Sequence, residues 1–316
     1  MGRRRGGTAV HGWLVVDKPE GLSSADVVNR VKRLFDARKC GHGGTLDPLA
    51  TGVLPVAFGE ATKTVAYAMD RSKAYRFLLR WGEARSTDDR EGEVTETSPT
   101  RPDEAAIDAA LDAFVGEIEQ VPPVFSAIKV GGERAYRLAR ADKEVTLEAR
   151  TVRVESLRRA ADGKRNDADH TEFEVVCGKG TYVRSLARDL ARALGSCGHV
   201  AAIRRTRVGG FRAEDAISLA SLISLGHSAA AFEWLKPVET ALDDIPALAV
   251  TGDEANQLRS GQPVSVVRML GRLAADASAL DEIGNGSVVV AMAQDRPVAL
   301  TRLDRGRLCP FRVLNL

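Results

Sequence analysis

The glycine-rich stretch CGHGGTLDPLATGVLPVAFGEATK, residues 40–63, holds His42, Thr45 and Asp47 close together. Glycine lets such a loop be compact enough for a ligand backbone to approach, and Pro48 biases Asp47 toward an extended conformation. This combination predicts a stiff platform for one carboxylate, which would act as a nucleophile or as a stabilising anion. The plain alternative, an Asp-Pro pair that merely starts a turn, stays open on these residues alone.

Other chemistries fit this stretch less well. The chain has no G-x-x-x-x-G-K-[ST] motif and no G-x-G-x-x-G after a strand, which disfavours nucleotide binding of either kind. No obvious second acid accompanies Asp47, which weakens a two-carboxylate glycosidase. The four cysteines lie far apart without a C-x-x-C pair, so we expect free thiols and no zinc site.

A second candidate, Arg184, lies near the start of a helix predicted over residues 181–194, with Thr181 as its cap and Gly195 as its stop. A cation in the first turn faces the positive end of the helix dipole, where an acidic residue is preferred. Arg184 is therefore either a surface arginine or the partner of a carboxylate elsewhere in the fold. A bidentate arginine would orient an aspartate and keep it ionised.

The rest of the pattern predicts an α/β chain in which the glycine-rich stretch is largely loop. Residues 13–16 form a short apolar run, and residues 73–81 alternate in polarity, which predicts two strands. Residues 86–96 are polar without periodicity and predict an exposed loop. After about residue 244, short apolar runs alternate with glycine-rich turns, as is typical of a small β-rich domain.

Composition indicates a globular protein. The chain has 316 residues, 44% of them hydrophobic and 28% charged, with a net charge of +2. Basic clusters at 3–5 and 204–212 are either phosphate contacts or solvated faces. No apolar run is long enough to span a membrane and no secretory signal opens the chain, so we expect a cytoplasmic protein without a membrane partner.

Six ordered blocks resemble the TruB family of bacterial tRNA pseudouridine synthases, over about residues 12–214. They are GWLVVDKPEGLSSADVVNRVKRLF, GHGGTLDPLATGVLPVAFGEATK, KAYRF, PPVFSAIKVGGERAYRLAR, GKGTYVRSLARDLARALG and IRRTRVGGF. The resemblance implies the α/β (α+β) pseudouridine synthase core, a mixed and mostly antiparallel sheet flanked by helices, over residues 11–244. A flexible basic segment, 1–10, would precede it, and a PUA-like RNA-binding domain, 245–316, would follow.

The function implied is isomerisation of the family's target uridine in the tRNA T-loop to pseudouridine, by a monomer that also grips the acceptor stem. The resemblance implies catalytic roles for Asp47, Arg184 and Tyr75, with Tyr75 stacked on the flipped base rather than only packed in the core. The other substrate-binding candidates are His42, Gly43, where threonine or alanine is expected, Tyr182 and Ile203. Candidates for phosphate contacts are Lys18, Lys63, Lys129, Arg204, Arg205 and Arg207.

Three points stay open at this level. The reaction needs no redox step, so we expect neither cofactor nor metal, but attack at C1′, attack at the base and a glycal route all remain possible. The loops 86–92 and 122–140 are candidates for closing on RNA. A non-catalytic RNA-binding or RNA-folding protein and a glycoside-type hydrolase that releases uracil are the two alternative functions.

Overall fold

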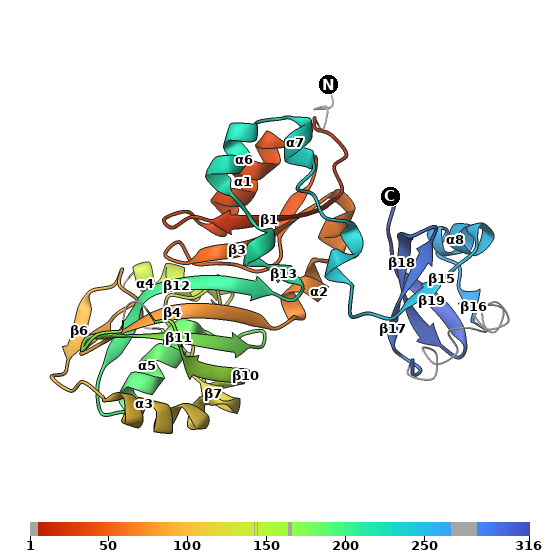
Figure 1. The fold of residues 1–316 in the computed structure, drawn as a ribbon. Helices are drawn as coiled ribbons and strands as arrows, with labels where there is room; N and C mark the ends of the chain where they lie inside the picture. The colour runs from red at the N-terminus through yellow and green to blue at the C-terminus, as the bar shows by residue number, and fades with distance from the viewer. Residues whose placement is uncertain (1–5, 142, 144, 164–165, 267–282) are drawn as a thin grey trace.

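One large sheet runs through the main body of the molecule (Figure 1). The computed structural model describes residues 6–141, 143, 145–163, 166–266 and 283–316, and ten strands of this described chain form the sheet. Their order is β14 (Ile217–Ser218), β1 (Gly12–Lys18), β3 (Thr51–Phe58), β12 (Gly198–Val208), β4 (Lys73–Trp81), β11 (His170–Cys177), β10 (Arg150–Arg159) and β7 (Gly116–Gln120), with β13 (Phe211–Arg212) on β12 and β2 (Cys40–His42) on β3.

The pairing confirms the expected mixed and mostly antiparallel sheet. Strands β1 and β14 are parallel, as are β3 and β12, and the other pairs in this sheet are antiparallel. The strands predicted at residues 13–16 and 73–81 are present as β1 and β4.

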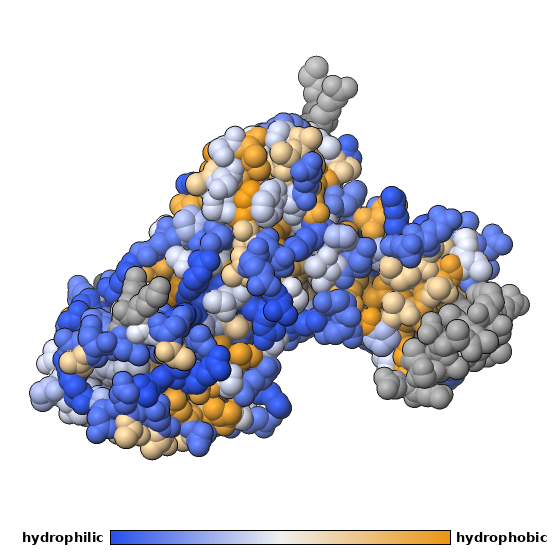
Figure 2. Space-filling model, in the orientation of Figure 1, coloured by the Kyte–Doolittle hydropathy of each residue, from blue (hydrophilic) through white to orange (hydrophobic). Residues whose placement is uncertain are grey.

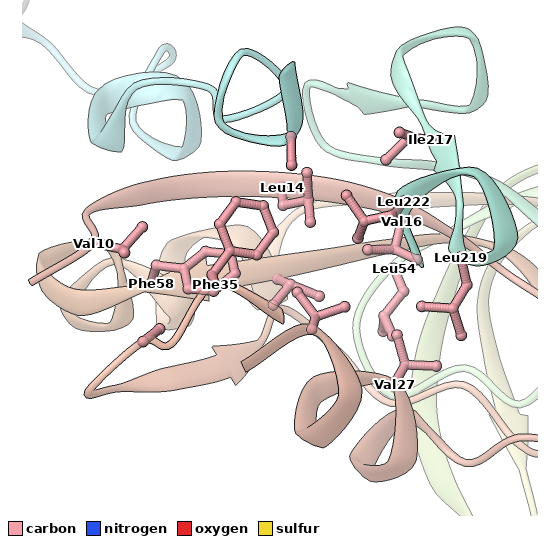
Figure 3. Close-up of a cluster of buried hydrophobic side chains, with 14 of the residues drawn as sticks. Val10, Leu14, Val16, Val27, Phe35, Leu54, Phe58, Ile217, Leu219 and Leu222 are labelled. Atoms are coloured by element: carbon pink, nitrogen blue, oxygen red, sulfur yellow. The ribbon is translucent and has the colours of Figure 1, made fainter. Parts of the chain in front are cut away.

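The first half of the body packs around β1 and β3. Helix α1 (Ser24–Leu34) begins with a capping box between Ser23 and Asp26, and its apolar stripe turns Val27 and Val31 inward. Figure 3 shows Phe35 and Phe58 meeting in this core, with ring centroids 5.0 Å apart. Helices α6 (Leu219–Leu225) and α7 (Ala229–Phe232) cover it. Val10 is already buried here, while the basic cluster 3–5 lies outside the described residues.

The second half packs α3 (Glu104–Leu111) and α5 (Val183–Ala193) on strands β4, β10 and β11. The predicted helix is present as α5, and Gly195 ends it at φ +67°. The predicted cap is wrong: Tyr182 is the N-cap and makes no side-chain cap bond. The Thr181 hydroxyl donates instead to the Arg153 carbonyl, at 3.5 Å, because the preceding turn lies against β10.

The two halves meet along β12, which lies between β3 and β4. Tyr75 of β4 and Ile203 of β12 pack against the hydrophobic cores of both halves. The body is therefore divided by a seam, and these two side chains lie in it.

The prediction that the glycine-rich stretch is largely loop is wrong for its second part, which forms the buried strand β3. Gly52 has φ +98°, and a Cβ there would lie 2.2 Å from the carbonyl oxygen of Arg205. Glycine is needed because β12 approaches β3 this closely. At Gly52 the glycine therefore admits the protein's own backbone rather than a ligand.

The C-terminal unit is β-rich, as predicted. It contains β15 (Ala247–Ala249), α8 (Gly252–Arg259), β16 (Val264–Ser265), β17 (Val288–Ala293), β18 (Arg296–Asp304) and β19 (Arg307–Val313). Its last strand docks on the body: Lys63 Nζ donates to the Val313 carbonyl at 2.8 Å, and the Asn315 amide donates to Glu60 at 2.7 Å. Leu314 inserts beside Trp13 in a buried cluster.

A hollow of about 700 Å³ lies between this unit and the body, lined by residues of both, including Arg71 and Arg207 of the body and Val288 of the unit. Figure 2 shows the corresponding notch in the surface. Among the described helices, none has the length and apolar character required to cross a membrane.

Candidate active site

Asp47 lies on the loop between β2 and β3, where hydrogen bonds fix its neighbours on both sides. Leu46 is buried, and its amide donates to the Ser24 hydroxyl at 2.8 Å. The Pro48 carbonyl accepts from the Gly21 amide, also at 2.8 Å. The Asp47 side chain itself remains 47% exposed. The loop thus holds its backbone rigidly and leaves the carboxylate accessible.

Arg184, from the first turn of α5, reaches across the seam to this carboxylate. Its Nη2 lies 2.8 Å from Asp47 Oδ2, although only 6% of the arginine side chain is exposed. The guanidinium also donates to the carbonyls of Thr87, at 2.9 Å, and Phe125, at 3.0 Å. A buried cation needs such partners, and they fix the direction in which it meets Asp47.

Sequence reasoning missed Asp89, whose carboxylate lies 3.2 Å from Arg184 Nη1. Arg184 is therefore shared between two aspartates and does not form the two-nitrogen fork on Asp47 that we expected. The prediction of an exposed loop over 86–96 is wrong at this point, because Asp89 is 3% exposed. The backbone on either side of it is bonded to Val200 of β12, which fastens the loop to the sheet.

Lys18 lies at the end of β1 and is hydrogen-bonded to the Asp47 loop. Its ammonium donates to the carbonyls of Pro19 (2.9 Å), Leu22 (2.6 Å) and Pro48 (3.1 Å), and the residue is fully buried. Burial lowers the pKa of Lys18 to about 8, and the nearby Asp47 charge opposes that shift. The predicted phosphate contact needs correction, because the ammonium is enclosed by protein carbonyls.

Arg205 requires the same correction. This arginine is 1% exposed. Its guanidinium donates to the carbonyls of Thr45 (3.2 Å) and Gly44 (3.0 Å) in the loop and of Val53 (2.8 Å) in β3. It therefore ties the loop to β12 and cannot reach an RNA phosphate in this conformation. Its guanidinium also places a positive charge close to the loop that carries Asp47.

Tyr75 and Ile203 form the apolar side of the site. Burial raises the pKa of the Tyr75 phenol, the Arg205 charge opposes this, and the Asp47 charge raises it further. The phenol therefore stays protonated near neutral pH. Ile203 lines an open depression of about 490 Å³ together with Leu49 and Thr51, next to the Asp47 loop. Its lining combines the apolar Ile203 and Leu49 with charged side chains such as Arg76, so it suits a planar ring that also carries polar groups.

His42 ends β2, immediately before this loop. Burial lowers the pKa of its imidazole, and the nearby Arg205 lowers it further, so the ring is neutral near pH 7. Gly43 is buried, and a Cβ there would lie 3.3 Å from the Trp13 ring and 3.4 Å from Pro55. A larger residue here would press against the indole, and glycine avoids that contact.

The remaining predicted contacts lie at several places. Tyr182 stacks under Arg150, whose guanidinium carbon is 5.0 Å from the ring centroid. Lys63 is engaged at the C-terminal dock described above. Lys129 is exposed on the hairpin of β8 (Lys129–Val130) and β9 (Glu133–Arg134). Arg204 makes a two-nitrogen pair with Asp17, at 2.9 and 2.8 Å, and Arg207 lines the hollow beside the C-terminal unit.

The geometry at the seam supports covalent or electrostatic catalysis. An accessible carboxylate is held by a buried guanidinium, and a phenol and an apolar wall lie next to it. Such a preorganised anion stabilises a developing cation or attacks an electrophilic carbon without having to reorganise.

Comparison with known proteins shows the family of the whole chain. Residues 32–183 match the N-terminal domain of the TruB family pseudouridylate synthases, and residues 184–243 match the tRNA pseudouridylate synthase B C-terminal domain. Proteins named tRNA pseudouridine synthase B are similar over the full chain. The one from Rhodospirillum rubrum is 53% identical over 316 residues, which cover 100% of both chains. The one from Gluconacetobacter diazotrophicus is 55% identical over 313 residues, which cover 99% of this chain and 100% of the relative.

A solved structure shares the fold as well. The crystal structure of a Cbf5-Nop10-Gar1 complex matches with a TM-score of 0.72 and 25% identity, covering 96% of this chain and 85% of that one. The matched domains together span more than half of the sequence, and the full-length relatives are about half identical to it. The chain therefore belongs to the TruB family of pseudouridylate synthases.

Proposed function

We propose that this enzyme isomerises the T-loop target uridine of tRNA to pseudouridine, with Asp47 as the reacting carboxylate. The observation that carries the proposal is the 2.8 Å pair of Asp47 with the buried Arg184, formed across the seam. The relatives named tRNA pseudouridine synthase B support tRNA as the substrate. A tRNA substrate also implies a cytoplasmic enzyme.

The reaction breaks the bond from C1′ to N1, turns the uracil and joins C1′ to C5, so the base must first leave the RNA stack. Flipping costs a few kcal/mol. Stacking on the Tyr75 ring returns about 1–3 kcal/mol, and Ile203 would pack on the base beside it. Asp47 then meets the sugar or the base while Arg184 holds its carboxylate in a fixed orientation.

The C-terminal unit is proposed to contact the acceptor stem. Phe311 is 46% exposed, and Arg302 lies over its ring at 5.8 Å, so this surface offers a cation and an aromatic face together. The dock formed by Lys63 and Val313 would hold that surface at a fixed place relative to Asp47. Since one chain supplies every group in the site, we propose that it acts as a monomer.

The test is an assay of a T-loop hairpin carrying tritium at C5 of uridine. Joining C1′ to C5 displaces that hydrogen, so tritium appears in water while the base stays attached to the RNA. We expect release with pure protein and no added metal or cofactor. Free uracil would indicate the hydrolase instead, and tight binding without tritium release would indicate a non-catalytic RNA-binding protein.

The Lys18 ammonium predicts a fall in the rate as pH rises above about 8, the pKa of the buried side chain. Three N–H groups serve three carbonyls, so loss of one proton removes one of the hydrogen bonds that hold the segments on either side of the Asp47 loop. Stability changes in the opposite direction. Because the folded pKa lies below the ordinary 10.5, the cost of burying the charge is present below pH 8 and disappears as pH rises toward 10.5.

Single-turnover rates measured between about pH 6 and 10, on both sides of the shifted pKa of Lys18, would show this alkaline limb of the pH–rate profile. Lys18→Met should react more slowly over the whole pH range, and its rate should not fall further as the pH rises above about 8. Lys73→Met is the matched control, because Lys73 also has a pKa lowered to about 8 by burial but donates to Met69 and Arg71 instead. A limb that disappears in Lys73→Met and stays in Lys18→Met would contradict the assignment.

A further inference from the structure

An ion pair between Glu20 and Arg90 crosses the seam beside the active site. Glu20 follows β1 in the first half of the body, and its neighbour Gly21 bonds to the carbonyl of Pro48, next to Asp47. Arg90 belongs to the second half, where it follows Asp89 and its backbone amide donates to Val200 at 3.1 Å.

Hydrogen bonds and ion pairs connect this pair to Asp47 on both sides of the seam. On one side, Asp47 pairs with Arg184, which pairs with Asp89, the residue before Arg90. On the other side, the carbonyl of Pro48, next to Asp47, is bonded to Gly21, the residue after Glu20. Glu20 also lines the depression that Ile203 walls. The pair therefore joins the two sides of the entrance through which a flipped nucleotide reaches Asp47.

The pair is ill-suited to a purely structural role. The Glu20 side chain is 52% exposed and that of Arg90 is 44% exposed, and ion pairs in water add little to stability. A guanidinium, however, binds phosphate with the same planar geometry as carboxylate. Glu20 thus lies where an RNA phosphate oxygen would meet Arg90.

We propose that Arg90 binds a backbone phosphate next to the target nucleotide, and that Glu20 occupies this position until RNA arrives. Exchange of carboxylate for phosphate then opens the bridge across the seam as the substrate enters. The loop carrying Arg90 stays in place during this exchange, because the amide of Arg90 is bonded to Val200 and the side chain of Asp89 is paired with Arg184. The inference rests on the proposed function, since it takes tRNA as the ligand.

The experiment measures affinity for a fluorescent T-loop hairpin by anisotropy over a series of salt concentrations, with Asp47→Asn in every variant to prevent turnover. Glu20→Gln should bind about two- to fivefold more tightly, because Arg90 no longer has to leave a carboxylate. Arg90→Gln should bind more weakly and lower the slope of log K against log salt by about one. The double variant should match Arg90→Gln, since without Arg90 the carboxylate competes for nothing.

Asp169→Asn is the matched control. Asp169 is also 52% exposed and pairs with an arginine, Arg101, so its change should leave affinity nearly unaltered. Tightening in Glu20→Gln that persists without Arg90 would overturn the exchange, as would an unchanged salt slope in Arg90→Gln or weaker binding in Glu20→Gln. Affinity is measured in the Asp47→Asn background, and pseudouridine formation is assayed separately with unaltered Asp47. The expected affinities together with no pseudouridine from the unaltered protein would support the exchange and refute the proposed function. Pseudouridine formation without the expected affinities would refute only the exchange.

Discussion

Asp47→Asn is expected to abolish pseudouridine formation, with a loss of at least about 10³-fold in single-turnover rate, the scale of removing a group at the reacting centre. The amide keeps the size and shape of the carboxylate but cannot attack carbon or stabilise a cation as an anion. RNA affinity should stay close to that of the unaltered protein, because the Asp47 loop is held through its backbone by Ser24, Lys18 and Arg205.

Rate and affinity are measured separately, by tritium release and by anisotropy. Asp36→Asn is a suitable control, since it makes the same chemical change at an exposed position of the same half, at φ +45°, which asparagine tolerates. A rate within about tenfold of the unaltered protein would show that the Asp47 charge does not take part in the chemistry.

Arg184→Lys is expected to lower the rate by about 10²–10³-fold while changing RNA affinity little. Lysine keeps the charge, but its compact ammonium cannot reach Asp47, Asp89 and the carbonyls of Thr87 and Phe125 together. The Asp47 carboxylate then loses its fixed direction. The buried Asp89 also loses part of its pairing, so thermal unfolding should be measured alongside the rate.

Arg188→Lys provides the control one turn further along α5. Arg188 has comparable partners, Asp88 at 2.8 Å and the Val121 carbonyl at 2.8 Å, and it pairs with Asp88 and Asp189 rather than with Asp47. A loss of stability shared by both variants, with the rate reduced only in Arg184→Lys, would separate positioning from folding. A defect confined to RNA affinity would instead make Arg184 a phosphate contact.

The pairing of Asp47 with Arg184 was open to prediction because both residues conflict with their local surroundings. Asp47 follows a run of backbone-special residues, and Arg184 lies at the wrong end of a helix dipole for a cation. Such conflicts indicate a role set by tertiary structure. The strands and α5 followed from apolar periodicity, which depends only on neighbouring residues.

Asp89, Lys18 and Arg205 could not be placed in this way. Charge can be counted in a sequence, but burial here depends on where distant carbonyls converge, and three of them surround each cation. Asp89 looks like part of a solvated acidic loop until β12 lies against it. The one available signal was a pair of adjacent aspartates, Asp88 and Asp89, in a short loop after a strand.

The seam has a consequence for the ancestry of this chain. The first core contains residues up to Phe58, and the second core is formed by the segment that follows. The chain then returns to the first core at Ile203 and Ile217, so the two halves are not separable modules. A chimera that takes its residues up to α2 (Val65–Asp70) from one relative and the remainder from another would combine surfaces that had not adapted to each other. In such a hybrid both the first core and the ion pair of Asp47 with Arg184 would have to form between residues inherited from different parents.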